Sequence, residues 1–274
     1  RLVGSEMCIR ERPLSLGIEV RKELIFNLLY KILREQGEEI RGLYERNDVK
    51  IRLLEGMEEN KGWFTLAEAP EPGEPLTEIV ENGIRYNVDV ENGQKTGFFL
   101  DQKYNRQAIA KIARGKHVLD CFTHTGAFAL NAAAGGAAAV TAVDISAEAV
   151  QMTDANASKN GLDKVVKGLK ANVFDLLSEL VNNKSREYDF IILDPPAFTK
   201  SGSTVKNAIR GYKEINLKAM KLLPRGGYLA TCSCSHFMKE ELFVQMLHDA
   251  AADANVQLRQ IEARQQSPDH PILW

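Results

Sequence analysis

The fold follows from the stretch His117-Val118-Leu119-Asp120-Cys121-Phe122-Thr123-His124-Thr125-Gly126. It begins with a short apolar run that is typical of a strand, and it passes through a polar turn into an alanine-rich helix. The same order recurs downstream, with strands predicted at 139–143, 164–170, 190–193, 228–232 and 256–263 and helices between them. Strict alternation of strands and helices predicts a doubly wound, mostly parallel α/β sheet with helices on both faces.

Upstream of residue 94 the pattern is different. Apolar residues recur at helical spacing over 19–36, and strands are predicted at 77–80, at 84–90 and within 40–53, where Val49, Ile51 and Leu53 alternate. A proline-rich loop spans 68–75. We therefore expect an unassigned segment at 1–18, a small α+β domain at 19–93 and the α/β domain at 94–274.

Composition narrows the class of protein. The 274 residues are 44% hydrophobic and 26% charged with a net charge of −2, so the chain has enough apolar residues for a core and is not typical of disorder. No stretch is apolar enough for a membrane span, and no secretory signal is visible. We expect a soluble, cytoplasmic protein whose four cysteines, at 8, 121, 232 and 234, are reduced thiols.

Polar residues follow four of the predicted strands: Asp120, Asp144, Asp194 and the run Thr231-Cys232-Ser233-Cys234. In a doubly wound sheet, ligands bind outside these carboxyl ends. The first turn lacks the G-x-G-x-x-G pattern that binds a pyrophosphate, since of these glycines it holds only Gly126. S-adenosylmethionine fits, with its ribose at Asp144 and its cationic aminoacyl end at Asp120. The alternative is that these acids cap helices.

The motif Asp194-Pro195-Pro196-Ala197-Phe198 ends the fourth strand of the α/β domain. Two prolines prevent the ladder from continuing, so the carboxylate should point into the crevice. Phe198 offers a ring that could stack on a base, or it is a core aromatic. The stretch 197–225 that follows holds 7 Lys or Arg against one Glu, whereas 35–82 is acidic. The basic stretch indicates contact with a polyanion, or it is a solvated helix face.

The chain resembles the bacterial class I rRNA large-subunit methyltransferase I family, which makes 5-methylcytosine in 23S rRNA. The resemblance rests on Gln94–Gln102, Leu119–Phe122, Asp194–Phe198, Arg210–Asn216, Ser233–Ser235 and Asp269–Pro271. It implies a Rossmann-like methyltransferase domain at 94–274 that binds S-adenosylmethionine. Family members carry an N-terminal PUA RNA-binding domain and continue past Asp269-His270-Pro271, so we expect this chain to lack the former and the last strands of the sheet.

The resemblance also implies the residues of the site. Those expected to bind the cofactor are Phe98, Gln102, Asp120, Phe122, Thr123, Gly126, Asp144, Ile145, Asn172 and Asp194. Those expected to bind RNA are Phe198, Lys200, Lys206, Arg210 and Lys213. The expected partner is 23S rRNA, with no membrane and no metal, and the oligomeric state, a homodimer among the options, is left open.

Methylation of cytosine C5 explains the choice of catalytic residues. This carbon is a poor nucleophile until a thiolate adds to C6. Cys234, which matches the Ser-Cys-Ser motif of the family, is the predicted nucleophile, and Asp194 is predicted to hold the edge of the base. Related cytosine enzymes have a second cysteine where this chain has Pro196, so one cysteine must serve attack and release.

Several alternatives remain at this stage. Cys232 is a rival nucleophile, both thiols could be inert core residues, and Cys232, Cys234 and His236 could begin a metal site that lacks a fourth ligand. The whole chain could instead methylate an exocyclic amine or a small molecule without covalent catalysis. It could also be a non-catalytic RNA-binding fragment.

Overall fold

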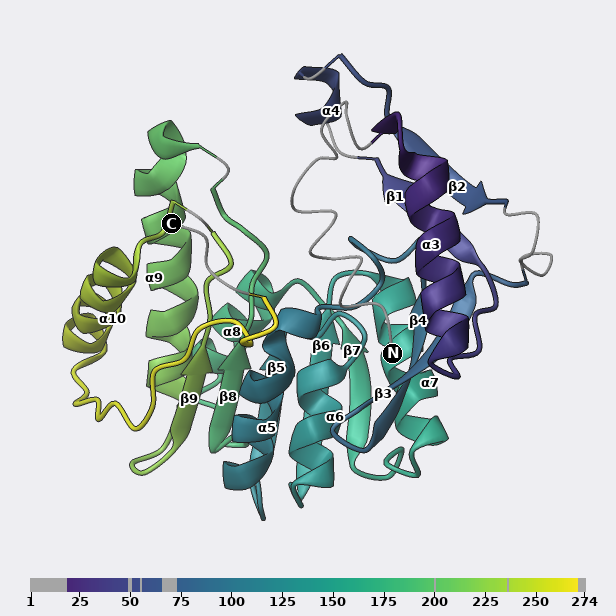
Figure 1. Cartoon of the computed structure of the whole chain (residues 1–274). Coiled ribbons are helices and arrows are strands. Elements are labelled where there is room, and N and C mark those ends of the chain that lie inside the picture. Colours follow the sequence, from purple (N-terminus) through teal and green to yellow (C-terminus); the bar gives the residue numbers. More distant parts are fainter. Residues whose placement is uncertain are drawn as a thin grey trace. The chain divides into compact units, whose positions relative to one another are not determined.

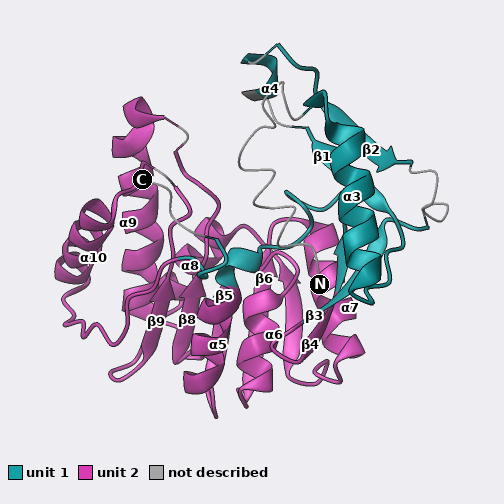
Figure 2. Ribbon diagram, in the orientation of Figure 1, with its two compact units in different colours: residues 1–80, 87–102, 266–274 teal, residues 81–86, 103–265 magenta. Residues whose placement is uncertain are grey.

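The computed structural model describes residues 19–48, 51–54, 56–65, 73–199, 201–235 and 237–270. These residues divide between two compact units (Figure 2). The first unit comprises 1–80, 87–102 and 266–274, and the second comprises 81–86 and 103–265. The predicted domain boundary between residues 93 and 94 stays a prediction.

The second unit is built on a parallel five-stranded sheet (Figure 1). Its strands are β5 (His117–Cys121), β6 (Ala139–Asp144), β7 (Val166–Lys170), β8 (Phe190–Leu193) and β9 (Tyr228–Thr231). They lie in the order β7-β6-β5-β8-β9, and every adjacent pair is parallel. The chain moves outward from β5 to β7 and then returns to place β8 on the other side of β5. The sheet therefore has its topological switch point between β5 and β8, where doubly wound sheets bind their ligands.

Helices cover both faces of this sheet, as the alternation of strands and helices predicts. They are α5 (Lys103–Ile112), α6 (Ala127–Ala134), α7 (Ala147–Lys159), α8 (Val173–Asn182), α9 (Val205–Leu222) and α10 (Glu240–Ala254). Side chains alternate along a strand. In β5, Val118 accordingly packs in the core beneath α5, α6 and α7, while Leu119 and Cys121 pack in the core beneath α8 and α9. Asp120 faces α6, since it accepts a hydrogen bond from the third residue of that helix, Ala129.

The described elements of the N-terminal region are short. They are α3 (Lys22–Glu35), β1 (Leu43–Asn47), α4 (Ile51–Leu54), β2 (Asn60–Phe64), β3 (Leu76–Glu81) and β4 (Ile84–Asp89). β1 and β2 form an antiparallel pair, and β3 and β4 form a second two-stranded sheet. Two single 3₁₀ turns, η1 (Leu100–Gln102) and η2 (Gly202–Thr204), complete the elements. The predicted combination of an α+β region with an α/β sheet is confirmed.

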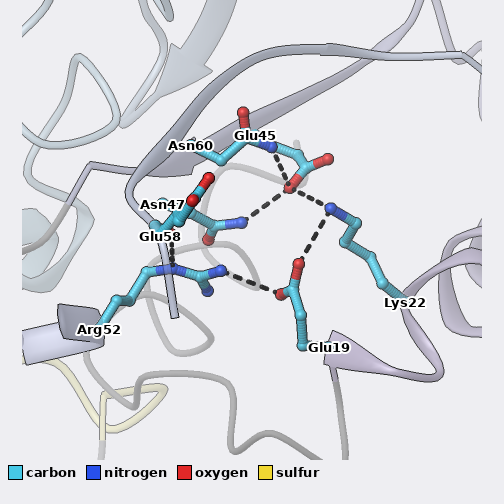
Figure 3. A network of polar contacts seen from close by, with 7 residues as sticks. All are labelled: Glu19, Lys22, Glu45, Asn47, Arg52, Glu58 and Asn60. Carbon is cyan, nitrogen blue, oxygen red and sulfur yellow. Dashed lines mark hydrogen bonds and ion pairs between the residues drawn. The ribbon is translucent and has the colours of Figure 1, made fainter. Parts of the chain in front are cut away.

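A polar network holds α3, β1, β2 and α4 of the first unit together (Figure 3). One oxygen of the buried Glu45 accepts hydrogen bonds from the side chains of Lys22, Asn47 and Asn60. The same Lys22 reaches Glu19, which also pairs with the buried Arg52. Part of the acidity of residues 35–82 is therefore neutralised inside the unit and is not available to repel a polyanion.

The strand predicted within 40–53 is present as β1, at 43–47. The alternating residues that suggested it are not in this strand, because Ile51 and Leu53 lie in the single helical turn of α4 and Val49 lies outside the described residues. An alternating run this short does not distinguish a strand from a helical turn. Residues 256–263 have no regular structure, and Leu258 and Ile261 are exposed. Alternation alone does not make a strand, and residues 256–263 pair with no strand in the described part of the chain. The sequence also gave no indication of β2.

Candidate functional site

Three carboxylates stand at the carboxyl ends of neighbouring strands. Asp120 lies in β5, Asp144 is the last residue of β6, and Asp194 directly follows β8. Burial is the main cause that raises the pKa of Asp120 to about 7, and the negative charges of Asp194 and Asp144 contribute to this value against the hydrogen bonds from Thr123 and Ala129, which lower it. Asp120 pairs with Ala142 of β6 and with Ile192 of β8, and all three strands are parallel, so the three carboxylates lie at the same edge of the sheet.

The Asp120 carboxylate has one satisfied oxygen and one unsatisfied oxygen. Its Oδ2 accepts the hydroxyl of Thr123 at 2.6 Å and the backbone N–H of Ala129 at 3.0 Å. Its Oδ1 is buried and has no hydrogen-bond partner among the described residues. The capping alternative therefore explains Oδ2, because Ala129 is in the first turn of α6. It leaves Oδ1 unexplained, and a buried acceptor without a partner costs free energy unless a ligand satisfies it.

The turn between β5 and α6 is built from left-handed backbone. Phe122, His124 and Gly126 have φ values of 65°, 54° and 82°. The N–H of His124 donates to Asp144 Oδ2 at 3.0 Å, which ties the turn to the end of β6. Non-glycine residues adopt this conformation rarely, and such strain concentrates at ligand sites. The turn is therefore fixed in place by the two carboxylates that it connects.

Gly126→Ala is expected to destabilise the protein by about 2 kcal/mol. The added Cβ would lie 2.7 Å from Thr153 Cγ2 and 2.8 Å from Leu130 Cδ1, at a φ of 82°. Gly161→Ala is the matched control, since Gly161 also has a positive φ, 68°, but its Cβ would meet nothing within 4 Å. Urea denaturation of both variants separates the cost of the contact from the cost of the backbone. Equal destabilisation would show that the contact is harmless.

Asp144 is not a helix cap. Its oxygens accept the N–H groups of His124 and Ser146 at 3.0 Å each. The cap of α7 is Ser146 itself, whose hydroxyl accepts the N–H of Ala149 at 3.1 Å. The two backbone hydrogen bonds fix the plane of the Asp144 carboxylate, and each oxygen keeps a lone pair for a further donor. Ile145 follows immediately and is 67% exposed, which is unusual for isoleucine.

Cys234 lies beside the Asp194-Pro195-Pro196 motif. Its Sγ is 3.7 Å from the carbonyl oxygen of Pro195, although the two residues are 39 positions apart in the chain. The side chain is exposed. The structure therefore brings the predicted nucleophile to the end of β8, next to Asp194, in a position that a substrate can reach.

The other described cysteines are less suited to attack. Cys121 is fully buried among α8 and α9 side chains, and burial raises the pKa of its thiol well above the usual range. Cys232 is less exposed than Cys234, and its N–H donates to Leu193 O at 2.8 Å, which extends the ladder by one residue beyond β9. The metal alternative requires His236, which lies outside the described residues. Within the described ranges no cluster of three or more His, Cys, Asp or Glu side chains could hold a metal ion.

The residues predicted to bind RNA divide into different environments. The Phe198 ring packs 4.6 Å from Tyr212 and 5.8 Å from Phe174, so its environment is that of a core aromatic. Lys213 pairs with Asp253 of α10 at 2.7 Å. Lys206 and Arg210 are exposed on α9, and Lys200 lies outside the described residues.

The sequence model of the S-adenosylmethionine-dependent methyltransferase family matches residues 66–273. The chain belongs to this family. The resemblance inferred from the motifs is confirmed, and with it the cofactor.

Curated relatives share the family. The ribosomal RNA large subunit methyltransferase I of Aeromonas salmonicida is 43% identical over 260 residues, which are 94% of this chain and 63% of that protein. The protein of the same name from Photobacterium profundum is 41% identical over the same shares. This methyltransferase chain therefore spans somewhat less than two thirds of the length of these relatives.

Solved structures agree with the fold. An S-adenosylmethionine-dependent methyltransferase from Streptococcus mutans superposes with a TM-score of 0.72 at 25% identity, covering 92% of this chain and 62% of that one. A structure of SMU.776, a methyltransferase complexed with SAH, superposes with the same TM-score at 26% identity, covering 91% of this chain and 62% of that one.

The residues of the site suit S-adenosylmethionine. The unsatisfied Oδ1 of Asp120 is an acceptor for its cationic amino group, and the oriented carboxylate of Asp144 is an acceptor for its ribose hydroxyls. The exposed Ile145 offers an apolar surface beside that ribose position. Asn172 caps α8, since its Oδ1 accepts the N–H of Phe174 at 2.9 Å. Its contact with the cofactor stays a prediction.

Phe98 and Gln102, the two remaining predicted cofactor residues, belong to the first unit. Phe98 is 1% exposed, so its side chain is closed to solvent. Gln102 ends η1. Their participation in cofactor binding stays a prediction. In the part of the chain that the structure describes, no helix is both long enough and apolar enough to cross a membrane.

Proposed function

We propose that this chain methylates C5 of a cytosine in large-subunit ribosomal RNA, with Cys234 as the nucleophile. The observation that carries the proposal is the exposed Cys234 thiol at 3.7 Å from the Pro195 carbonyl, next to Asp194. A methyltransferase that acts on an exocyclic amine needs no thiol at this position. The names of the curated relatives support ribosomal RNA as the substrate.

Cys234 supplies the covalent step. Its thiolate forms a bond to C6 of the cytosine, and the electron pair displaced from the C5–C6 double bond makes C5 nucleophilic. Bound S-adenosylmethionine supplies the electrophilic methyl group that C5 takes. A general base then accepts the C5 proton, the electron pair of the C5–H bond re-forms the C5–C6 double bond, and the C6–sulfur bond breaks so that the thiolate leaves. Asp194 holds the N3 and N4 edge of the ring during these steps, and Asp120 holds the cofactor.

The test is incubation with S-adenosylmethionine and large-subunit ribosomal RNA that contains 5-fluorocytidine. Fluorine at C5 cannot leave as a cation, so the protein should remain joined to the RNA after methyl transfer. Mass spectrometry of the digested adduct should place the bond on residue 234. Methylation of unmodified RNA without any adduct on the fluorinated RNA would favour a non-covalent reaction. Absence of both would contradict the proposal.

RNA binding gives a second prediction. Lys206 and Arg210 are exposed on α9, which begins soon after the Asp194-Pro195-Pro196 motif. Replacing both by Ala should weaken RNA binding. The plot of log affinity against log salt concentration, which falls with salt, should become less steep by about 1.4. Lys111→Ala is the matched control. Lys111 is exposed in the last turn of α5, which leads into the amino end of β5, whereas the proposed site lies at the carboxyl ends of the strands. Equal salt slopes in all three proteins would remove α9 from the RNA interface.

A further inference from the structure

Tyr212 is the buried centre of an aromatic cluster beside the proposed nucleophile. It lies in α9 within the motif Arg210–Asn216, and the proposed reaction gives Tyr212 itself no other role. The side chain is fully buried. Its ring lies 4.6 Å from the ring of Phe198 and 5.8 Å from that of Phe243. A buried tyrosine hydroxyl needs polar partners, and the partners of this one are informative.

The Tyr212 hydroxyl bonds to both serines that flank Cys234. Ser233 Oγ donates to Tyr212 Oη at 3.1 Å. The hydroxyls of Tyr212 and Ser235 are 2.9 Å apart. Because a phenol has a single proton and accepts through its lone pairs, it satisfies both contacts by accepting from Ser233 and donating to Ser235. One buried oxygen atom therefore anchors the residues before and after the thiol.

This double anchor decides where Cys234 points. The hydroxyls of Ser233 and Ser235 are both held inward by Tyr212, so the segment is fixed on either side of Cys234. The Cys234 side chain is left on the outward side. The structure agrees, since Cys234 is exposed while Ser235 is buried.

The same side chain also contacts the loop that carries Asp194. Phe198 belongs to the motif that begins at Asp194, and its ring lies against that of Tyr212. Gly211 makes this approach feasible, because a Cβ at this position would lie 3.2 Å from Phe198 Cδ2. Tyr212 thus touches the loop after β8 through its ring and the loop after β9 through its hydroxyl.

We infer that Tyr212 is a positioning residue that holds the thiol of Cys234 toward the Pro195 carbonyl and the substrate position beside it. It acts through Ser233 and Ser235 and does not itself contact the reacting atoms. The inference rests on the proposed function for its catalytic consequence. Its structural consequence, the fixed conformation of residues 233–235, is independent of the substrate.

Tyr212→Phe tests the inference because it removes only the hydroxyl. We expect kcat for RNA methylation to fall by about 10- to 100-fold, since a small misplacement of a reacting group has an effect of this size. The KM values for RNA and S-adenosylmethionine should stay within about two-fold of wild type, because the hydroxyl contacts neither. Amide hydrogen exchange at residues 233–235 should become about ten-fold faster.

Two further variants make the outcome decisive. Ser233→Ala combined with Ser235→Ala removes the same hydrogen bonds from the other side, and adding Tyr212→Phe should then have little further effect. Tyr188→Phe is the control, because it removes a tyrosine hydroxyl that bonds to Thr141 elsewhere in the same unit. Wild-type kcat and wild-type exchange in Tyr212→Phe would overturn the inference. So would a loss expressed in KM alone. Wild-type protein that forms no adduct with fluorinated RNA would contradict the proposed function, and the exchange measurement would still decide the anchor.

Discussion

Cys234→Ser is expected to lower kcat for RNA methylation by about 10³-fold or more and to abolish the adduct with 5-fluorocytidine RNA. A serine hydroxyl at neutral pH is far less nucleophilic than a thiolate toward C6. The substitution is nearly isosteric, the side chain is exposed, and its contact with the Pro195 carbonyl is a long one, at 3.7 Å. The affinity for S-adenosylmethionine, measured by calorimetry, should therefore stay within about two-fold of wild type.

Cys232→Ser is the matched control for this variant. Cys232 is two residues away, is less exposed and holds its place through a backbone hydrogen bond that serine keeps. We expect it to retain most of the activity. If activity were lost in Cys232→Ser and kept in Cys234→Ser, Cys232 would be the nucleophile. That result would also remove the basis for the role of Tyr212.

Asp120→Asn should weaken S-adenosylmethionine binding by about 10²-fold or more, the cost of removing one partner of a buried charge pair. The Oδ1 atom of Asp120 is buried without a partner, so it is poised to accept from the cationic amino group. Asp189→Asn is the control, since Asp189 also accepts a backbone N–H, from His117, but precedes β8 at the opposite end of the strand. Calorimetric titration of both variants should show a loss in Asp120→Asn alone.

Asp120→Asn should also change how the affinity for S-adenosylmethionine depends on pH. The pKa of Asp120 is raised from 3.8 to about 7, so a proton must leave before the carboxylate can pair with the cofactor below pH 7. Wild-type affinity should fall by about ten-fold per pH unit from pH 7 to pH 5, and that of Asp120→Asn should stay flat over this range. Parallel pH profiles would show that Asp120 does not bind the cationic end.

The contribution of Asp120 to folding stability should depend on pH with the opposite sign to its contribution to cofactor affinity. A carboxyl whose pKa is higher in the folded protein than in the unfolded chain favours folding at low pH and loses that contribution as pH rises from about 4 to about 7. Asp120→Asn removes this dependence. The melting temperature of the variant relative to wild type should therefore increase between pH 4 and pH 8.

The sequence predicted the sheet because its strands are short apolar runs that end in polar residues, and this pattern depends only on local order. It could not predict the state of Asp120, because the pKa shift depends on burial and on Asp194 and Asp144, which only the fold brings close. Cys232 and Cys234 could not be distinguished either, since β9 ends at Thr231 and the alternation is then set by Tyr212, far away in the sequence. The strand predicted at 256–263 is absent because alternation is a local pattern, whereas a strand also needs a pairing partner, and these residues pair with none of the described strands.

The division of the chain between its two units has a practical consequence for engineering. The polypeptide passes from one unit to the other after residues 80, 86, 102 and 265. No single cleavage or truncation therefore releases either unit whole, and a graft of the catalytic sheet into another scaffold has to carry residues 81–86 along with 103–265. A chimera of two relatives made with a single crossover would build one unit from segments of both parents. The mismatched segment would be the region of β3 and β4 or the tail at 266–270. Recombination between such proteins is accordingly expected to succeed at paired crossovers that respect these four junctions.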